Sequence, residues 1–406
     1  MFFISFFMSQ EHLSDRIKSM TESATIAMSQ LSREMKAQGI DVISLSIGEP
    51  DFNTPDEVKQ AAKDAIDQNF SKYPPIAGFE DLKQAICDKF KTENNIDYSP
   101  SQIIVSTGAK QSIANVILAL VNEGDEVLLP APYWVSYIEL IKLAGGIPVE
   151  IPSSVENDFK VSAQDIAKAI TPKSKLIIYS SPCNPSGSVF TAQELREIAD
   201  VVLQKEDLYI LADEIYEYIN FTNDSISIAS FPDVYDRVAT VNGVAKGFAM
   251  TGWRLGYMGG PAWLVKACNK IQGQITSGTN TIAQKATIEA LKMGRSSTLY
   301  MKEAFLRRRN LMLDAFKNIP LAKINVPKGS FYLFPDMSAY FGKKYQNYSI
   351  NNANDLCLFL LHEAKVALVA GDSFGAPNCI RISYASADER LIEAMQRIES
   401  ALKLLH

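Results

Sequence analysis

The chain has 406 residues, of which 47% are hydrophobic and 21% charged, and its net charge is -6 at pH 7. This length can bury one large hydrophobic core or two moderate ones, and the negative charge argues against a nucleic-acid partner. The five cysteines form no C-x-x-C pair, and the three histidines lie near the chain ends or in a helix-like stretch, which argues against a disulfide framework, a zinc site and a histidine-based catalytic triad.

The scattered cysteines indicate reduced thiols, so we expect a cytoplasmic protein without a bound metal. The run from Met1 to Met8 is apolar but lacks the basic start and the cleavage site of a signal peptide. We interpret it as a leader, with Met8 as an alternative start. Residues 11–38 then show the apolar spacing of a helix, interrupted near residues 23–25 and ended by Gly39.

The run 42–55 predicts a short strand and a turn at Gly48, where a ligand can approach the backbone because glycine has no side chain. A helix is expected at 55–69, with Thr54 as its N-cap. A proline-rich loop containing Tyr73 and a helix at 79–91 follow it.

Residues 103–120 predict a strand, a turn of small residues and a helix. The turn Gly108-Ala109-Lys110 places free N–H groups and the positive end of the helix where an anion can bind. The turn lacks the G-x-G-x-x-G pattern, so it is not a dinucleotide fingerprint.

Two further strands are followed by residues that can contact a flat ligand. Trp134 comes shortly after the strand at 125–130, and its ring can either stack on a heteroaromatic ring or belong to the core. Asn184 follows the strand that begins at residue 176, and the prolines on both sides stiffen its backbone. Its amide is therefore either aimed at a ligand or closes an Asx-type turn.

The strand 208–216 carries acidic residues at its carboxyl end, with Asp213 followed three positions later by Tyr216. A carboxylate beside so many apolar residues is unfavourable unless it has a partner. Asp213 can be a helix cap, a member of an ion pair, or a ligand contact.

Lys246 lies between strand-like runs at 237–241 and 254–259, and its neighbours are Val, Ala, Gly, Phe and Met. Desolvation lowers the pKa of a lysine and provides the neutral amine that a Schiff-base lysine needs. The alternative is a lysine that extends from an apolar turn into water.

The C-terminal part predicts helices at 284–293, 297–316 and 355–365, and strands at 331–335, 366–375 and 379–384. Arg381 stands in the last strand between two isoleucines. Its forked guanidinium can hold a carboxylate through two hydrogen bonds or form an internal ion pair.

The alternation of strands and helices from about residue 103 to 259 predicts an α/β fold with a mostly parallel sheet flanked by helices. The candidate residues follow the carboxyl ends of strands, where such folds bind ligands. We expect a leader and small-domain arm at 1–55, a large domain at 56–290, and a smaller C-terminal domain at 291–406.

Several motifs resemble one family. The segment Lys246-x-Phe-x-Met-Thr-Gly-Trp-Arg254-x-Gly-Tyr resembles the cofactor-lysine segment of the class I aminotransferases, which use pyridoxal 5′-phosphate (PLP). Gly48-Glu-Pro-Asp-Phe, Asn184-Pro-x-Gly, Asp213-x-x-Tyr and Ile-Arg381-Ile-Ser resemble further motifs of the family in the same order. The resemblance covers the chain from about Ser14 and is greatest to the prokaryotic aspartate aminotransferase subgroup.

The resemblance implies a fold type I enzyme in which Lys246 holds PLP as a Schiff base and is the catalytic base. The implied cofactor-binding residues are Tyr73, Gly108, Ala109, Lys110, Trp134, Asn184, Asp213, Tyr216, Lys246 and Arg254. The implied substrate-binding residues are Gly48, Lys110, Trp134, Asn184 and Arg381. Tyr73 would reach the phosphate of a partner subunit, so the resemblance implies a homodimer with shared sites, unless this ring packs under its own loop.

The implied activity is ping-pong transamination, from L-aspartate and 2-oxoglutarate to oxaloacetate and L-glutamate. Residues 271–284 contain no Arg or Lys, whereas some relatives bind an acidic substrate side chain from this region. Lys110 is then the candidate for that role, unless it serves the phosphate or points to solvent. Ala245 stands where many relatives have serine, which makes the other phosphate-binding groups less redundant. An aromatic or prephenate aminotransferase, a PLP-dependent lyase and a non-enzymatic regulator are the alternatives.

Overall fold

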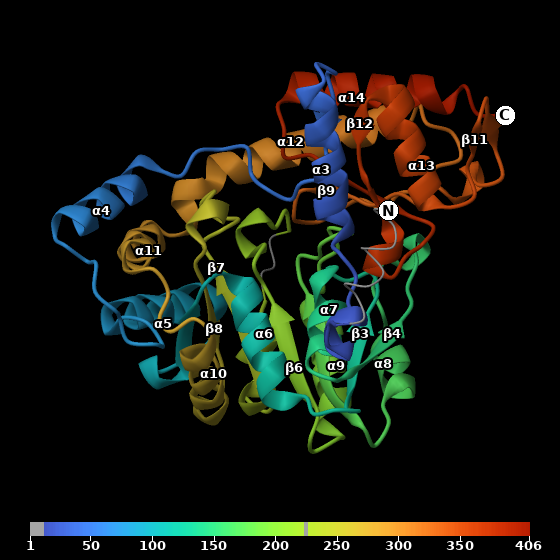
Figure 1. Cartoon of the computed structure of the whole chain (residues 1–406). Coiled ribbons are helices and arrows are strands. Elements are labelled where there is room, and N and C mark those ends of the chain that lie inside the picture. The colour runs from blue at the N-terminus through green and yellow to red at the C-terminus, as the bar shows by residue number, and fades with distance from the viewer. Residues whose placement is uncertain (1–11, 223–225) are drawn as a thin grey trace.

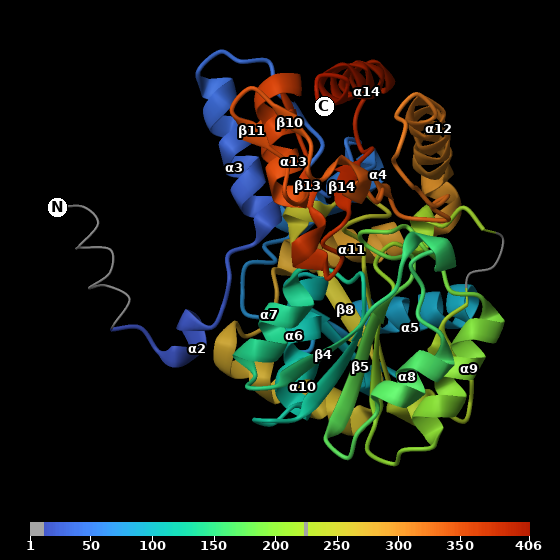
Figure 2. The ribbon, with the colours of Figure 1, turned by 90° about the vertical axis from the view of Figure 1, so that its right-hand side faces the viewer.

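The computed structural model describes residues 12–222 and 226–406, and it has a lower body built around a twisted sheet and a smaller upper body (Figures 1 and 2). The upper body combines the blue N-terminal helix α3 with the orange and red C-terminal elements (Figure 1). The leader expected at Met1 to Met8 lies outside the described residues.

The central sheet has seven strands within the described residues, in the order β2-β8-β7-β6-β5-β3-β4. Their bounds are β2 Ile103–Ser106, β3 Glu126–Pro130, β4 Ile147–Ile151, β5 Ser174–Ser180, β6 Tyr209–Asp213, β7 Val238–Gly243 and β8 Gly256–Gly259. Strands β4, β3, β5, β6 and β7 pair in parallel, whereas β8 is antiparallel to both β2 and β7. The predicted α/β fold with a mostly parallel sheet is therefore confirmed.

Helices cover both faces of the sheet (Figure 2). The helices of the lower body are α4 Asp56–Asp67, α5 Glu80–Asn94, α6 Ala109–Leu120, α7 Ser136–Leu143, α8 Ala163–Ala169, α9 Ala192–Leu203, α10 Ala262–Ile275 and α11 Thr281–Met293. Of these, α4 packs against α11 at the edge of the molecule rather than on the sheet (Figure 1). Ile210 and Leu211 are neighbours in β6 but belong to different hydrophobic clusters, because successive strand residues point to opposite faces. No helix in the described part of the chain combines the length and the apolar character that crossing a membrane requires.

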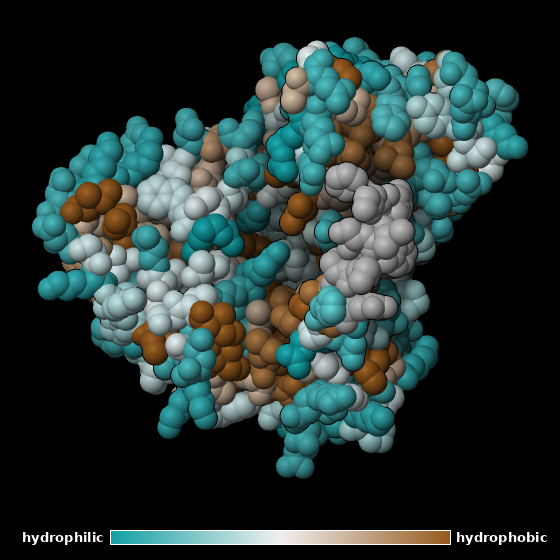
Figure 3. Space-filling view, viewed as in Figure 1, coloured by the Kyte–Doolittle hydropathy of each residue, from teal (hydrophilic) through white to brown (hydrophobic). Residues whose placement is uncertain are grey.

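The upper body has its own hydrophobic cluster, which includes Val42, Phe305 and Leu360. Its elements include α3 Ala24–Ala37, β1 Ile43–Ser44, α12 Leu299–Phe316, β9 Tyr332–Leu333, β10 Lys344–Tyr345, β11 Tyr348–Ser349, α13 Ala353–Phe359, β12 Val366–Ala367, β13 Val369–Ala370, β14 Ile380–Ser383 and α14 Asp388–Leu402. The short helix α2 Asp15–Lys18 precedes them and lies against α7 of the lower body (Figure 2). Strands β13, β14 and β9 form an antiparallel sheet, and β1 pairs in parallel with β12. On the face seen in Figure 3, the upper margin of this body is mainly hydrophilic.

One predicted helix start was wrong. Helix α4 begins at Asp56 with Pro55 in the N-cap position, and Thr54 does not cap it. The Thr54 hydroxyl instead donates a hydrogen bond of 2.8 Å to the carbonyl oxygen of Ala249. This contact joins the loop before α4 to the segment that follows Lys246, a long-range use of a threonine that the local pattern does not reveal.

Candidate active site

A cavity of about 270 Å³ lies at the carboxyl ends of the parallel strands, where the two bodies meet. Its lining includes almost all of the predicted site residues: Gly48, Gly108, Ala109, Lys110, Trp134, Asn184, Asp213, Tyr216, Lys246, Arg254 and Arg381. Tyr73 is not among the lining residues, and its side chain is 94% exposed in this single chain. The structure thus brings together side chains from both bodies and leaves Tyr73 apart.

Lys246 follows β7 in a turn of small residues, and its side chain points into the cavity. The Nζ atom donates a hydrogen bond of 2.5 Å to the carbonyl oxygen of Gly48 and lies 5.7 Å from the centre of the Tyr216 ring. Burial lowers the pKa of Lys246 to about 8, while the opposing effects of nearby anions and cations are smaller. The amine is therefore available as a nucleophile and base near neutral pH.

Asp213 ends β6 and is 5% exposed. The Tyr137 hydroxyl donates a hydrogen bond of 2.6 Å to Oδ2, and the Ile215 N–H donates one of 3.2 Å to Oδ1. Burial raises the pKa of Asp213 to about 6, against the lowering effect of these two hydrogen bonds. No cation of the described residues forms an ion pair with Asp213, so this carboxylate suits a ligand that carries an N–H group.

Arg381 lies in β14 and is 2% exposed. It donates hydrogen bonds to Asn184 Oδ1 at 3.0 Å and to the Ser46 carbonyl oxygen at 2.6 Å, and the Tyr332 ring centre lies 4.6 Å from its Cζ atom. Its Nε atom has no acceptor, and none of residues 12–222 and 226–406 offers it a carboxylate within ion-pair distance. A buried guanidinium without a counterion is strongly unfavourable, so this geometry suits a ligand carboxylate.

The N-terminus of α6, together with Arg254 and Lys110, forms a second region of the cavity that suits an anion. Gly108 has a φ of 82°, and a Cβ atom at this position would lie 2.5 Å from Arg254 Nη2. Arg254 donates a hydrogen bond of 2.8 Å to the Thr251 carbonyl oxygen. Glycine therefore allows the guanidinium to approach the first N–H groups of the helix, which have no partner within the helix.

The Lys110 Nζ atom lies 4.8 Å from the centre of the Trp134 ring, and both residues line the cavity. Burial lowers the pKa of Lys110, and the positive charge of Arg254 lowers it further. Lys110 therefore does not point away to solvent. The half-buried Trp134 ring meets Tyr137 edge-on, with ring centres 5.5 Å apart.

The sequence reasoning missed several residues of the site. Tyr137 binds Asp213, Tyr332 forms a hydrogen bond of 2.8 Å with the Tyr216 hydroxyl, and Thr25 reaches Arg381 Nη2 at 3.4 Å. Tyr137 follows Trp134 by three positions, so the segment after the strand at 125–130 offered a signal for it as well. Tyr332 stands in an apolar aromatic run, which offers no local signal of a polar role.

An amine activated by burial, opposite a carboxylate that can accept a hydrogen bond from a ring nitrogen, is the arrangement in which fold type I enzymes hold PLP. The chain belongs to the aminotransferase class I and II family, whose model matches residues 40–398. It is thus an aminotransferase, and its cofactor is PLP. The orphaned Nε atom of Arg381 and the glycine-lined cradle at Gly108 fit a ligand with a carboxylate and a phosphate.

Three known proteins show how close this similarity is. The chain is 45% identical to a bifunctional aspartate aminotransferase and glutamate/aspartate-prephenate aminotransferase of Petunia hybrida, over 96% of this chain and 82% of that protein. The aspartate aminotransferase structure from Rhizobium meliloti superposes with a TM-score of 0.94 at 38% identity, covering 97% of this chain and all of that one (100%). The aspartate aminotransferase of Thermus thermophilus with maleate gives a TM-score of 0.90 at 37% identity, over 96% of this chain and 99% of that one.

Proposed function

We propose that the enzyme transfers the amino group of L-aspartate to 2-oxoglutarate by a ping-pong mechanism. The observation that carries this proposal is the buried guanidinium of Arg381, which lacks a carboxylate partner among the described residues and lines the same cavity as Lys110. Two separate cations match the two carboxylates of a dicarboxylic substrate. The aspartate aminotransferase names of the relatives and the maleate in the Thermus structure support the same substrate class.

The residues that would hold the cofactor follow from their positions in the cavity. Asp213 would accept a hydrogen bond from the ring nitrogen, Asn184 and Tyr216 would contact the ring oxygen, and Trp134 would lie against the ring face. The turn Gly108-Ala109-Lys110, Arg254 and Tyr73 of a second copy would bind the phosphate. When it is bound, PLP supplies an electron-accepting ring that stabilises negative charge at the substrate Cα atom.

The chain's own groups would bind the substrate and move its proton. Arg381 would hold the α-carboxylate, with the Asn184 amide and the Gly48 backbone beside it, and Lys110 would contact the side-chain carboxylate. The Lys246 amine would take the proton from Cα and deliver it during transfer. With a pKa of about 8, roughly a tenth of this amine is neutral at pH 7 before the cofactor binds.

We propose a homodimer in the cytoplasm. The 94% exposure of the Tyr73 ring supports a second copy covering it, and the five buried free thiols support a reducing compartment. For the domains, we propose the division at residues 1–55, 56–290 and 291–406. The hydrophobic cluster of the upper body supports it, because most of its residues belong to the N- and C-terminal parts of the chain, with Ile215, Tyr216 and Ile219 of the large domain adjoining them.

Prephenate is a second candidate acceptor of the amino group. Ile26 lines the cavity but is 63% exposed, so the entrance has an apolar side chain that a ring could contact. The name of the Petunia relative includes prephenate. A cavity with an apolar entrance and an inner pair of cations suits both dicarboxylic and ring-bearing acids.

The test is an amino-donor panel with purified, PLP-loaded enzyme and 2-oxoglutarate, followed by detection of glutamate and of the 2-oxo acid product. The proposal expects the highest kcat/KM for aspartate, and a second panel with prephenate as acceptor tests the other candidate. Lys246→Ala is the control and should abolish turnover and the visible absorption of bound cofactor. Release of ammonia or carbon dioxide without glutamate would indicate a lyase instead.

A further inference from the structure

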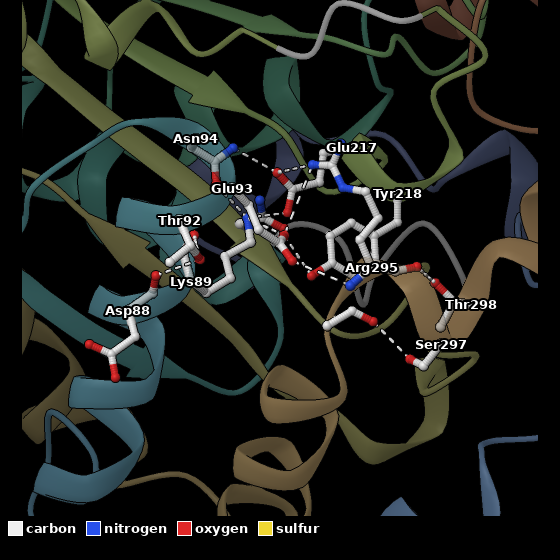
Figure 4. Close-up of polar contacts among 12 residues, drawn as sticks. Asp88, Lys89, Thr92, Glu93, Asn94, Glu217, Tyr218, Arg295, Ser297 and Thr298 are labelled. Atoms are coloured by element: carbon white, nitrogen blue, oxygen red, sulfur yellow. Dashed lines mark hydrogen bonds and ion pairs between the residues drawn. The ribbon is translucent and has the colours of Figure 1, made fainter.

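A second group of buried charges lies behind the cavity, between α5 and the 3-10 helix Glu217–Ile219 that follows Tyr216 (Figure 4). Lys89 and Glu217 are 4% and 6% exposed and form a short ion pair. The Asn94 side chain links them, since its Oδ1 atom accepts a hydrogen bond of 2.7 Å from Lys89 Nζ and its Nδ2 atom donates one of 2.8 Å to Glu217 Oε2. Neither Lys89 nor Glu217 lines the cavity.

Three further side chains surround this pair (Figure 4). The Tyr218 hydroxyl donates a hydrogen bond of 2.8 Å to Glu93 Oε2. The Nη2 atom of Arg295, from the turn after α11, lies 4.0 Å from Glu93 Oε2 and 3.9 Å from Glu217 Oε2. Burial opposes ionisation of Glu217, but the charges of Lys89 and Arg295 hold its pKa below the usual range. The cluster therefore joins α5, the 3-10 helix and the segment before α12.

The cluster reaches the active site by two routes. One route is the chain itself, because the Glu217 N–H donates to the Glu214 carbonyl oxygen at 3.0 Å and the Ile219 N–H to the Tyr216 carbonyl oxygen at 2.8 Å. These bonds make residues 213–219 a tight unit that carries Asp213 and Tyr216. Fixing Glu217 from outside the cavity therefore fixes the direction of the two side chains that face into it.

The other route is the Tyr218 ring, which packs against Gly247, the residue after Lys246. A Cβ atom at Gly247 would lie 2.6 Å from Tyr218 Cδ2, and the Tyr218 and Phe248 ring centres are 5.5 Å apart. Tyr218 therefore closes the rear of the turn that presents Lys246, and its hydroxyl is fixed by Glu93.

We propose that the Lys89–Glu217 pair and Tyr218 form a positioning network that holds Asp213 and Lys246 in register and keeps water from the rear of the site. This inference rests on the proposed roles of those two residues. A buried ion pair is weak as a source of net stability, but removing one partner leaves an uncompensated buried charge. We therefore expect Glu217→Gln to loosen residues 213–219 and to admit water behind Lys246.

The test measures the pH midpoint of the visible absorption of the PLP-loaded enzyme, which reports protonation at the Lys246 nitrogen. The charged groups that influence Lys246 are Glu49, Arg381, Arg254 and Asp213, and the test variants leave all of them in place. Because burial is what most disfavours the charged nitrogen, water entry should raise the midpoint. We expect a rise of about half a pH unit in Glu217→Gln, a threefold change in the protonation equilibrium.

Tyr218→Phe is the milder variant, since it keeps the ring on Gly247 and removes only the hydroxyl bond to Glu93. Tyr218→Phe should raise the midpoint by less than Glu217→Gln does. If Glu217→Gln does not fold, the midpoint of Tyr218→Phe alone tests the inference. Lys160→Met is the matched control. It breaks the 2.5 Å pair between Lys160 and Glu194 on α9, outside the cavity lining, and should lower the unfolding temperature without moving the midpoint.

An unchanged midpoint in Tyr218→Phe and Glu217→Gln, with only a lower unfolding temperature, would overturn the inference and leave the network a purely structural role. An equal shift in Lys160→Met would overturn it as well, because the midpoint would then follow general stability. Failure of the proposed function is distinguishable, because it would appear as absent aspartate turnover in the wild-type enzyme, whereas the midpoints of the wild type and the variants would still be measurable.

Discussion

Replacing Lys110 by alanine separates substrate recognition from cofactor binding. In the structure the Lys110 Nζ atom lies over the Trp134 ring at 4.8 Å and lines the cavity with Arg381. The variant removes the cation proposed to contact the side-chain carboxylate of aspartate. A neutral donor such as an aromatic amino acid makes no such contact and therefore serves as an internal reference.

The expected effect has two parts. Loss of the cation over Trp134 should cost about 0.5–1 kcal/mol for every donor, which is a two- to fivefold fall in kcat/KM. Loss of the partner of a desolvated carboxylate should cost a further ~2–4 kcal/mol for aspartate alone. The ratio of kcat/KM for aspartate to that for an aromatic donor should therefore fall about 30- to 900-fold.

The assay is steady-state kinetics with both donors and saturating 2-oxoglutarate, with Lys110→Arg as the variant that keeps the positive charge. The lysine recognises aspartate in its charged form, which is lost as pH rises through its pKa. Since burial and Arg254 lower this pKa, the preference for aspartate should decline with rising pH earlier than for an ordinary lysine. An equal fall for both donors in Lys110→Ala would refute the assignment and point to damage at the cofactor site.

Three other predictions follow from the same geometry. The pKa of Asp213 is raised from 3.8 to about 6, so its contribution to stability is full below pH 4 and lost by pH 7. In cofactor-free protein, the free energy of unfolding of Asp213→Asn, measured with urea, should therefore rise by about 3 kcal/mol relative to wild type between these two pH values. A difference that does not change with pH would contradict this. Arg381→Lys should lower kcat/KM for aspartate and aromatic donors alike, by an amount that corresponds to ~2–5 kcal/mol of lost transition-state stabilisation, while the visible absorption persists. A loss for aspartate alone would be the contrary result. Sedimentation should show that the active enzyme is a dimer, and a PLP titration should show a lower affinity in Tyr73→Phe than in wild type. An active monomer at assay concentration would disprove the role of Tyr73.

The sequence alone determined the main strands and helices of the sheet, and together with the family resemblance it named about half of the residues that line the cavity. The alternation of apolar strands and helices is a local property, and it predicts a parallel α/β sheet because crossover helices force neighbouring strands into the same direction. Residues at the carboxyl ends of such strands meet at one edge, so the strand pattern by itself places Asn184 and Asp213 together. The apolar neighbours of Lys246 likewise predicted its burial, although its role as the cofactor lysine came from resemblance to a family.

The tertiary structure decided which groups are paired and which remain free. Tyr137 satisfies Asp213 across 76 positions of sequence, and Thr54 leaves the helix it was expected to cap and binds Ala249. Arg381 could have been part of an internal ion pair, and only the packing of β14 against Ser46 and Asn184 shows that it is not. Periodicity specifies the face on which a side chain lies, but hydrogen-bond partners depend on how distant segments pack, so the local pattern contains no record of them.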